Sequence, residues 1–153
     1  MPYLWAFDEL IATFLPATRL AEELNEHFCK ENLQHAVYLH QWFLTLFISS
    51  LPLPMVLVIW DAIICGGLQE LLPISLSVLQ LLRSTLLEMK FEEIVSFFKT
   101  MRCREQEDTD FESIGRIAVS GSESIRIPDE VAEVLHRPLP LRTDDMMEPW
   151  LLV

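Results

Sequence analysis

Basic residues are scarce in this sequence, which has 11 Lys and Arg against 23 Asp and Glu and a formal net charge of −12. Nucleic-acid-binding domains carry a basic surface, and anionic membranes attract basic segments. The composition therefore argues against a nucleic-acid partner and against an anionic membrane surface. It would suit a partner with a basic face, although acidity alone is a statement about solubility.

Glycine and cysteine are also few, with four and three residues. No glycine lies in the Gly-x-x-x-x-Gly-Lys setting of a phosphate loop. The cysteines form no CxxC pair, and the spacings of His27 with Cys29 and of His35 with His40 do not make a zinc site. We expect no cofactor and no metal, and three buried thiols in the reducing cytosol.

Alternating polar and apolar runs of strand length are absent, whereas 51% of the residues are hydrophobic. Helical spacing of the apolar residues predicts an all-α fold. Helices are expected at 18–31, 36–50, 54–65, 72–89 and 91–102. Shorter ones are expected after a capping box, Thr109-x-x-Glu112, and from Pro128, with a loop at 121–124 between them. The helix at 72–89 should bury its leucines and turn Ser77, Gln80, Ser84 and Glu88 to solvent.

One apolar run, Trp42 to Trp60, holds 19 residues without a charge and meets the length of a membrane span. Pro52 and Pro54 interrupt it. Two short helices joined by a turn explain the run better than a span does, so we expect no membrane-spanning segment. Membrane attachment through this run remains a third-ranked interpretation of function.

The stretch from Tyr38 to Gly67 contains the two helices on either side of that turn. Both are apolar all round, which predicts burial on every side. Asp61 is exceptional because the helix dipole and an apolar environment both disfavour its charge. We predict that Asp61 is buried and accepts hydrogen bonds, from the indole N–H of Trp42 or from backbone N–H groups of the next helix, in a structural role. A catalytic or ligand-binding role is the alternative.

The order and spacing of residues in this stretch resemble the C-terminal half of a TBC domain. The resemblance rests on Tyr38-x-x-x-Trp42-Phe43-Leu44-Thr45-Leu46-Phe47, Leu51-Pro52-Leu53, Val56-Leu57-Val58-Ile59-Trp60-Asp61 and Gly66-Gly67. Val58 is a departure, since many relatives have Arg there. TBC domains are all-helical and accelerate GTP hydrolysis by Rab GTPases. The resemblance implies a Rab-type GTPase partner, and structural family-motif roles for Tyr38, Trp42, Phe43, Trp60, Asp61 and Gly66.

The catalytic motifs of that family, Ile-x-x-Asp-x-x-Arg and Tyr-x-Gln, do not occur in this chain. Tyr3 is followed by Leu4-Trp5 and Tyr38 by Leu39-His40, and no Asp is followed three places later by Arg. The resemblance therefore implies a lobe of a GTPase-activating domain that is not competent alone and has no catalytic residues of its own. The alternative is a helical interaction scaffold without catalysis.

The expected organisation is a helical lobe at 1–137, without the catalytic half, and a Pro-rich acidic tail at 138–153. The tail ends in Trp150-Leu151-Leu152-Val153, an apolar cluster expected to dock on an apolar groove, with an untethered end as the alternative. A half groove should leave an apolar wall that favours self-association. The expected location is cytoplasmic, with possible peripheral attachment to endomembranes. Which GTPase is engaged is not specified by the sequence.

Overall fold

A computed structural model describes residues 22–34, 36–106, 108–127 and 129, which form helices joined by turns and short loops. The α-helices are α2 (Glu22–Lys30), α3 (Ala36–Leu44), α4 (Leu53–Gly66), α5 (Leu71–Leu87), α6 (Phe91–Thr100) and α7 (Phe111–Ser122), with 3₁₀ turns at Leu68–Glu70 and Met101–Gln106. No strand occurs in these ranges, and the all-α prediction is confirmed. The tail at 138–153 and the helix expected from Pro128 lie outside the described residues.

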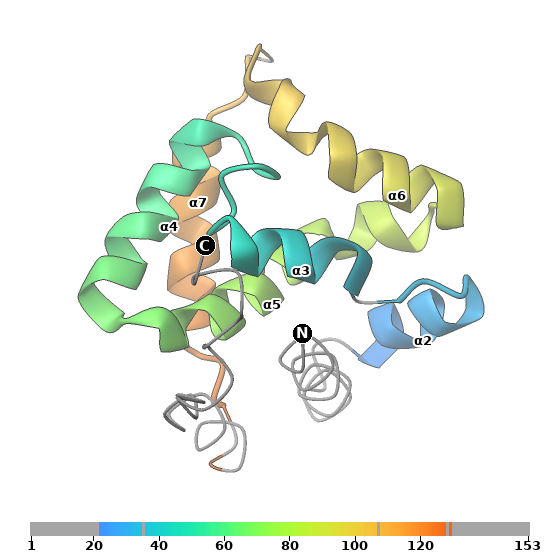
Figure 1. Ribbon diagram of the computed structural model, residues 1–153, viewed down its shortest axis with the longest axis horizontal. Helices are drawn as coiled ribbons and strands as arrows, with labels where there is room; N and C mark the ends of the chain where they lie inside the picture. Colours follow the sequence, from blue (N-terminus) through green and yellow to red (C-terminus); the bar gives the residue numbers. More distant parts are fainter. Residues whose placement is uncertain (1–21, 35, 107, 128, 130–153) are drawn as a thin grey trace, which may run out of the picture.

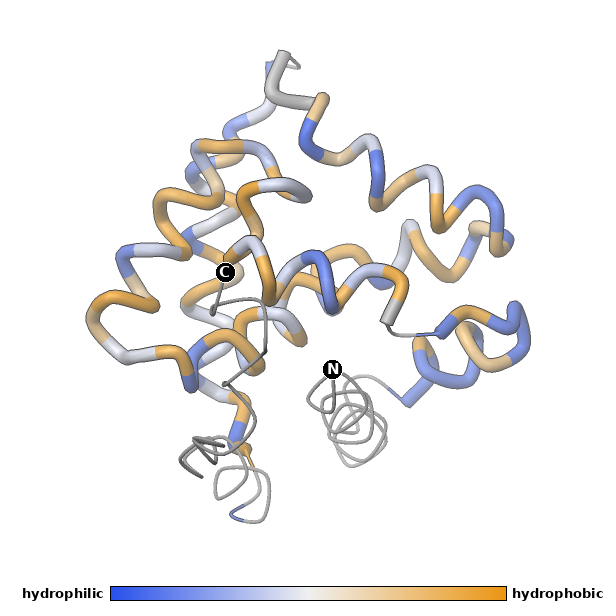
Figure 2. Tube along the Cα trace, viewed as in Figure 1, coloured by the Kyte–Doolittle hydropathy of each residue, from blue (hydrophilic) through white to orange (hydrophobic). Residues whose placement is uncertain are grey.

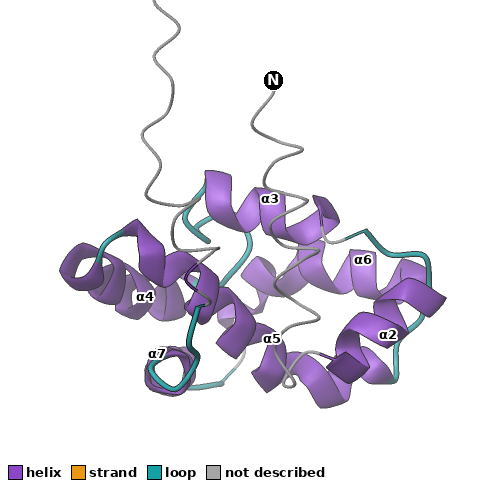
Figure 3. Ribbon diagram, turned by 90° about the horizontal axis from the view of Figure 1, so that it is seen from below, coloured by secondary structure: helices purple, strands orange, loops and turns teal. Residues whose placement is uncertain are grey.

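Helix α5 runs through the middle of the molecule and contacts α2, α3 and α7 (Figure 1). Helices α4 and α7 pack side by side at one end, and α2 and α6 lie at the other (Figure 3). Nine consecutive residues of α5, 71–79, are buried. The central position of α5 explains why its N-terminal half is covered on all sides.

An aromatic cluster at the contact of α3 with α6 contains the largest buried side chains. Tyr38 stacks on Phe98 with ring centroids 4.6 Å apart. Trp42 meets the edge of both rings, at 5.4 Å from Tyr38 and 5.8 Å from Phe98. Phe28 of α2 and Phe47 complete the cluster. Such edge and offset contacts add stability beyond the area they bury.

Helix α3 ends at Leu44, six residues before the predicted end. Leu46 and Phe47 have left-handed backbone angles, φ +48° and +69°, which no α-helix can continue through. The Phe47 N–H donates to the Trp42 carbonyl at 2.8 Å, closing the helix end. The apolar run at 42–60 is therefore two helices joined by a turn. The single span considered above does not form.

Helix α4 begins and ends where proline and glycine predict. Pro52 is its N-cap and Pro54 lies in the first turn, where the missing N–H costs nothing. Gly67, at φ +91°, is the C-cap and donates its N–H to the Ile63 carbonyl at 2.8 Å. A residue with a side chain would be strained at that angle.

Helix α7 differs from prediction at both ends. Its N-cap is Asp110, whose carboxylate accepts from the Ser113 N–H at 3.1 Å, and not Thr109. It continues to Ser122, two residues into the loop predicted at 121–124, and Gly121 packs closely against α5. A Cβ on Gly121 would lie 2.6 Å from the Ser77 hydroxyl oxygen. For the same reason Ser77 is buried, and its assignment to the polar stripe is wrong.

All three thiols, on Cys29, Cys65 and Cys103, are exposed, so the prediction that they are buried is wrong. Cys29 and Cys65 lie on the solvent side of α2 and α4. Their exposure follows from the side of the helix on which each cysteine lies, and not from the hydrophobic character of the thiol.

One helical stretch, Leu68–Leu87, is long and apolar enough to cross a membrane by those two criteria alone. Of its most apolar window, 56% is buried inside the protein. A core helix of a globular domain meets the same criteria, so the finding is weak evidence for a span.

Candidate functional site

The family-motif residues on α3 lie in the interior. Tyr38 and Trp42 are 1% and 0% exposed. Burial raises the pKa of the Tyr38 phenol far above its ordinary value, because the charged phenolate would lose its hydration. Phe43, the next motif residue, is half-buried against the same core. Nothing in this cluster presents a reactive group to solvent.

Trp60 of α4 joins the two helices of the motif. It is half-buried, and its indole N–H donates to the Leu46 carbonyl at 2.8 Å. Leu46 is one of the two residues in left-handed conformation after α3. The hydrogen bond therefore satisfies a carbonyl that the end of α3 leaves without a helical partner. It holds the turn against the side of α4.

Asp61 is exposed, and the prediction that it is buried is wrong. The indole N–H of Trp42, offered as its donor, is itself buried without an acceptor among the described residues. The prediction assumed that an apolar helix is covered on all sides. Asp61 instead lies on the side of α4 that its neighbours leave open, where water hydrates the carboxylate.

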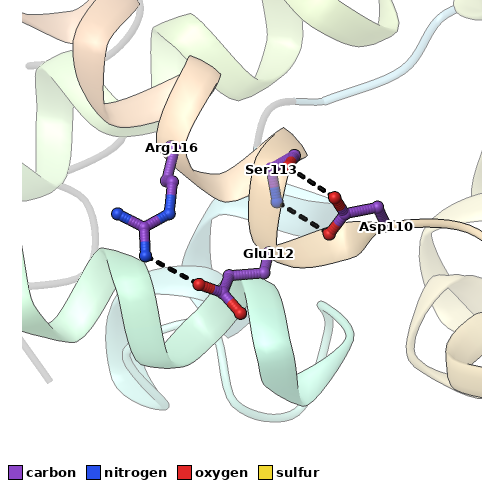
Figure 4. Close-up of polar contacts among 4 residues, drawn as sticks. All are labelled: Asp110, Glu112, Ser113 and Arg116. Carbon is purple, nitrogen blue, oxygen red and sulfur yellow. Dashed lines mark hydrogen bonds and ion pairs between the residues drawn. The ribbon is translucent and has the colours of Figure 1, made fainter.

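The charge of Asp61 affects the pKa of Arg116 on α7. The Arg116 guanidinium donates to the Glu112 carboxylate at 2.7 Å, one helical turn away (Figure 4). That bond and its charge raise the pKa of Arg116, and the charges of Asp110 and Asp61 add to the effect. The Asp110 carboxylate accepts from both the hydroxyl and the backbone N–H of Ser113, which lowers the pKa of Asp110. Both groups are on the surface, where such contacts contribute little stability.

Two glycines set the close packing around α4. A Cβ on Gly115 of α7 would lie 3.1 Å from the Met55 carbonyl oxygen and 3.3 Å from the Val58 Cβ. Gly66, the last family-motif residue, is near the flexible side chain of Glu70, which a Cβ would displace. Gly115 thus lets the backbones of α4 and α7 approach, and α7 covers the Met55 side of α4.

The opposite side of α4 remains open and apolar. Leu53, Leu57 and Ile64 are 45%, 51% and 79% exposed, and they follow one another at helical spacing with half-buried Trp60 between them. We call these four residues the α4 face. Figure 2 shows that most of the length of α4 is hydrophobic. Exposed Leu44 and Leu68 precede and follow α4 in the chain. The exposed apolar residues of the α4 face lie together on one side of α4 rather than scattered singly.

The α4 face was not predicted from the sequence, although the pattern that indicates it is present there. Positions 53, 57, 60 and 64 share one side of a helix, but the other sides of α4 are apolar as well. Spacing alone could not show which side the other helices would cover. The extent of α7 was missed too, and α7 determines which side of α4 is covered.

The α3–α6 contact also contains a cavity of about 250 Å³ that includes Trp42, Gln41, Ser49 and Lys99 in its lining. Gln41 donates to the Ser49 hydroxyl at 2.9 Å, and Thr45 and Ser49 share a hydrogen bond at 2.7 Å. These polar groups bond to one another and include no nucleophile with an adjacent base. Among the residues described, no three His, Cys, Asp or Glu side chains are close enough to hold a metal ion.

Comparison with known proteins gives the family. A profile described as RabGAP TBC domain matches residues 3–126. This chain belongs to the RabGAP TBC domain family. It is similar to GTPase-activating protein GYP5 of Eremothecium gossypii, with 29% identity over 143 residues, 86% of this chain and 16% of that protein. It is 33% identical over 97 residues to Rab GTPase-activating protein tbc-11 of Caenorhabditis elegans, covering 61% of this chain and 10% of that protein.

The match to Drainin of Dictyostelium discoideum is 30% identical over 118 residues, 76% of this chain and 26% of that protein. The TBC chain thus spans about a quarter or less of the length of these relatives. Both halves of the residue pattern, on α3 and α4, lie inside the matched range. The family accounts for the helical architecture around the α4 face.

Proposed function

We propose that this chain is the C-terminal lobe of a GTPase-activating domain for Rab-type small GTPases, organised as a lobe at 1–137 and a tail at 138–153. The α4 face is its contribution to the groove in which the GTPase is seated. The observation that carries this is the apolar stripe at Leu53, Leu57 and Ile64, exposed beside the helices that hold the family motif. Stripes of this kind are typical of surfaces that a partner covers.

The lobe does not accelerate GTP hydrolysis by itself in this proposal. An arginine supplied in trans to the GTPase contributes about 10³–10⁵ in rate, and the motifs that hold such an Arg and its partner Gln are absent from the 153 residues. Of the arginines whose side chains are described, Arg83 pairs with Glu23 of α2 and Arg116 pairs with Glu112, whereas Arg102 and Arg126 are exposed. None of the four stands in either catalytic motif.

The test is single-turnover hydrolysis by a panel of GTP-loaded Rab proteins with the chain in excess. We expect rates within about tenfold of the intrinsic rate. A larger acceleration with any Rab would show that the chain has a catalytic arginine and would overturn the proposal that it is inactive alone.

Binding to the same panel tests the α4 face separately. Leu57→Asp places a charge in the centre of the α4 face, and Ile117→Asp changes an exposed apolar residue of α7, 56% exposed, in a matched way. We expect weak, GTP-dependent binding that Leu57→Asp abolishes and Ile117→Asp preserves. Equal effects of the two variants would refute a specific role of the α4 face.

The second candidate is a helical scaffold that binds partners without regulating GTP hydrolysis. The missing catalytic motifs favour it. Binding that ignores the nucleotide state of the Rab would support the scaffold over the lobe. In either case the proposed location is cytoplasmic, with peripheral attachment to endomembranes, and the α4 face permits self-association when no partner covers it.

A further inference from the structure

A second apolar feature lies away from the α4 face, between α4, α5, α6 and the start of α7. It is a cavity of about 210 Å³. Its lining includes Met55, Val78, Leu81, Phe97, Phe111 and Ile114. Thr109 is the single polar residue among the described residues that line it. We call it the α5–α7 cavity.

The walls of the α5–α7 cavity make it a poor site for water. A buried water needs two to four polar partners, and one threonine hydroxyl does not supply them. Leu81, at the lining, is 42% exposed, while Phe111 and Ile114 are only half-buried. These side chains lack neighbours on the cavity side, so an apolar group placed there would gain contacts with several of them at once.

The chain itself contains an apolar group of suitable size outside the described residues. Trp150 begins the cluster Trp150-Leu151-Leu152-Val153 and follows an acidic stretch with Asp144, Asp145 and Glu148. The cavity of about 210 Å³ is lined mostly by apolar side chains, which an indole ring would contact on entering it. We propose that Trp150 of the same chain fills the α5–α7 cavity.

The length of the connecting segment allows this. The description of the chain ends at Asp129, shortly after α7, whereas the cavity lies at the beginning of α7. The 12 residues of α7 are about 18 Å long. The 21 residues from Asp129 to Trp150 can extend to about 70 Å. The segment is therefore long enough for Trp150 to reach the cavity, and a tether of this length gives Trp150 a high effective concentration there.

Two other arrangements are less favourable. The α4 face belongs to a single helix and would contact one side of an indole, whereas the lining of the α5–α7 cavity comes from several helices. A second copy would bring together two chains of net charge −12, which repel each other. An intramolecular contact avoids that repulsion and the loss of translational freedom that association costs.

The experiment uses ¹⁹F NMR of the full chain labelled with 5-fluorotryptophan. Trp150→Phe assigns the Trp150 resonance, and a labelled peptide of residues 138–153 gives its position in free solution. We expect the Trp150 resonance in the chain to be shifted from the peptide position and broadened, and to be unchanged on dilution. A resonance at the peptide position would overturn the proposal, and one that moves there on dilution would assign the contact to a second copy instead.

Matched variants locate the contact. Leu81→Asp places a charge at the α5–α7 cavity, and Leu57→Asp places one on the similarly exposed α4 face. We expect Leu81→Asp to return the Trp150 resonance to the peptide position and Leu57→Asp to leave it shifted. Ile114→Phe, which fills the cavity from within, is a second blocking variant whose fold is checked by the Trp42 and Trp60 resonances. Release by Leu57→Asp alone would refute the cavity as the site.

Discussion

Helices α3 and α4 both have apolar sequences, yet they differ in how much of their apolar surface is buried. In α3 the large aromatic residues Tyr38 and Trp42 are almost completely buried between α5 and α6. In α4 the apolar residues divide, so that Val56 and Ile59 are buried and Leu57 and Ile64 are exposed. An apolar surface in all directions shows that a helix can be buried, whereas the number of helices packed around it determines how much of it is buried.

The same difference applies to the two tryptophans of the family motif. Trp42 fills the core with no acceptor for its indole N–H in the described part of the chain, and Trp60 lies at the boundary with its N–H bonded to Leu46. The first contributes mainly packing. The second contributes a hydrogen bond that fixes the turn between the helices. The stability of variants in which Trp42 or Trp60 is replaced tests whether Trp42 contributes mainly packing and Trp60 mainly a hydrogen bond.

Trp42→Ala should have the largest effect on stability. It removes a fully buried side chain from the aromatic cluster, which typically costs about 3–5 kcal/mol. Trp60→Ala should cost less because that side chain is half-exposed. The measurement is the free energy of unfolding from urea titration followed by circular dichroism. If the two variants lose equal stability, α3 and α4 do not differ in burial as described.

Gly115→Ala tests the covered side of α4. The added Cβ meets backbone atoms of Met55 at 3.1 and 3.2 Å, and backbone cannot move aside as a flexible side chain can. Overpacking of this kind costs about 1–3 kcal/mol. Gly121→Ala is the matched control, because its close contact is the Ser77 hydroxyl, which can rotate away. A smaller loss for Gly115→Ala than for Gly121→Ala, measured by the same titration, would contradict tight packing of α7 on α4.

Alkaline pH tests the burial of Tyr38. Its pKa is raised in the folded state and is about 10 in the unfolded chain. The contribution of the neutral phenol to stability is therefore complete below pH 10 and is lost as pH rises above it. The slope is at most about 1.4 kcal/mol per pH unit for this one group. Tyr38→Phe should remove that component of the slope between pH 10 and 11. Parallel stability profiles for Tyr38→Phe and the unaltered chain would show that Tyr38 titrates normally.

The sequence was sufficient for the all-α fold and for the bounds of α4 to within one residue, and insufficient for the end of α3 and for the surfaces. Pro52, Pro54 and Gly67 act locally, through backbone angles and missing donors, so the bounds of α4 followed from the residues alone. The end of α3 did not follow from the residues alone. Leu46 and Phe47 adopt left-handed backbone angles there, and neither is a glycine or asparagine, the residues that usually mark such angles. That turn is stabilised by the bond from Trp60, which is distant in sequence. The exposure of Asp61 and the extent of the α4 face likewise depend on where α7 packs, which is tertiary information.

Asp61→Ala should have the smallest effect, although Asp61 lies within the family motif. Had Asp61 been buried, its removal would have left donors unpaired at a cost of about 1–3 kcal/mol. It is exposed, and its described electrostatic influence is on Arg116, a surface residue that bonds mainly to Glu112. Substitutions at such sites usually change stability by about 0.5 kcal/mol or less. The free energies of unfolding of Asp61→Ala and Glu112→Ala should therefore both lie close to that of the unaltered chain. A loss of more than about 1 kcal/mol for Asp61→Ala alone would contradict the exposed position of the carboxylate.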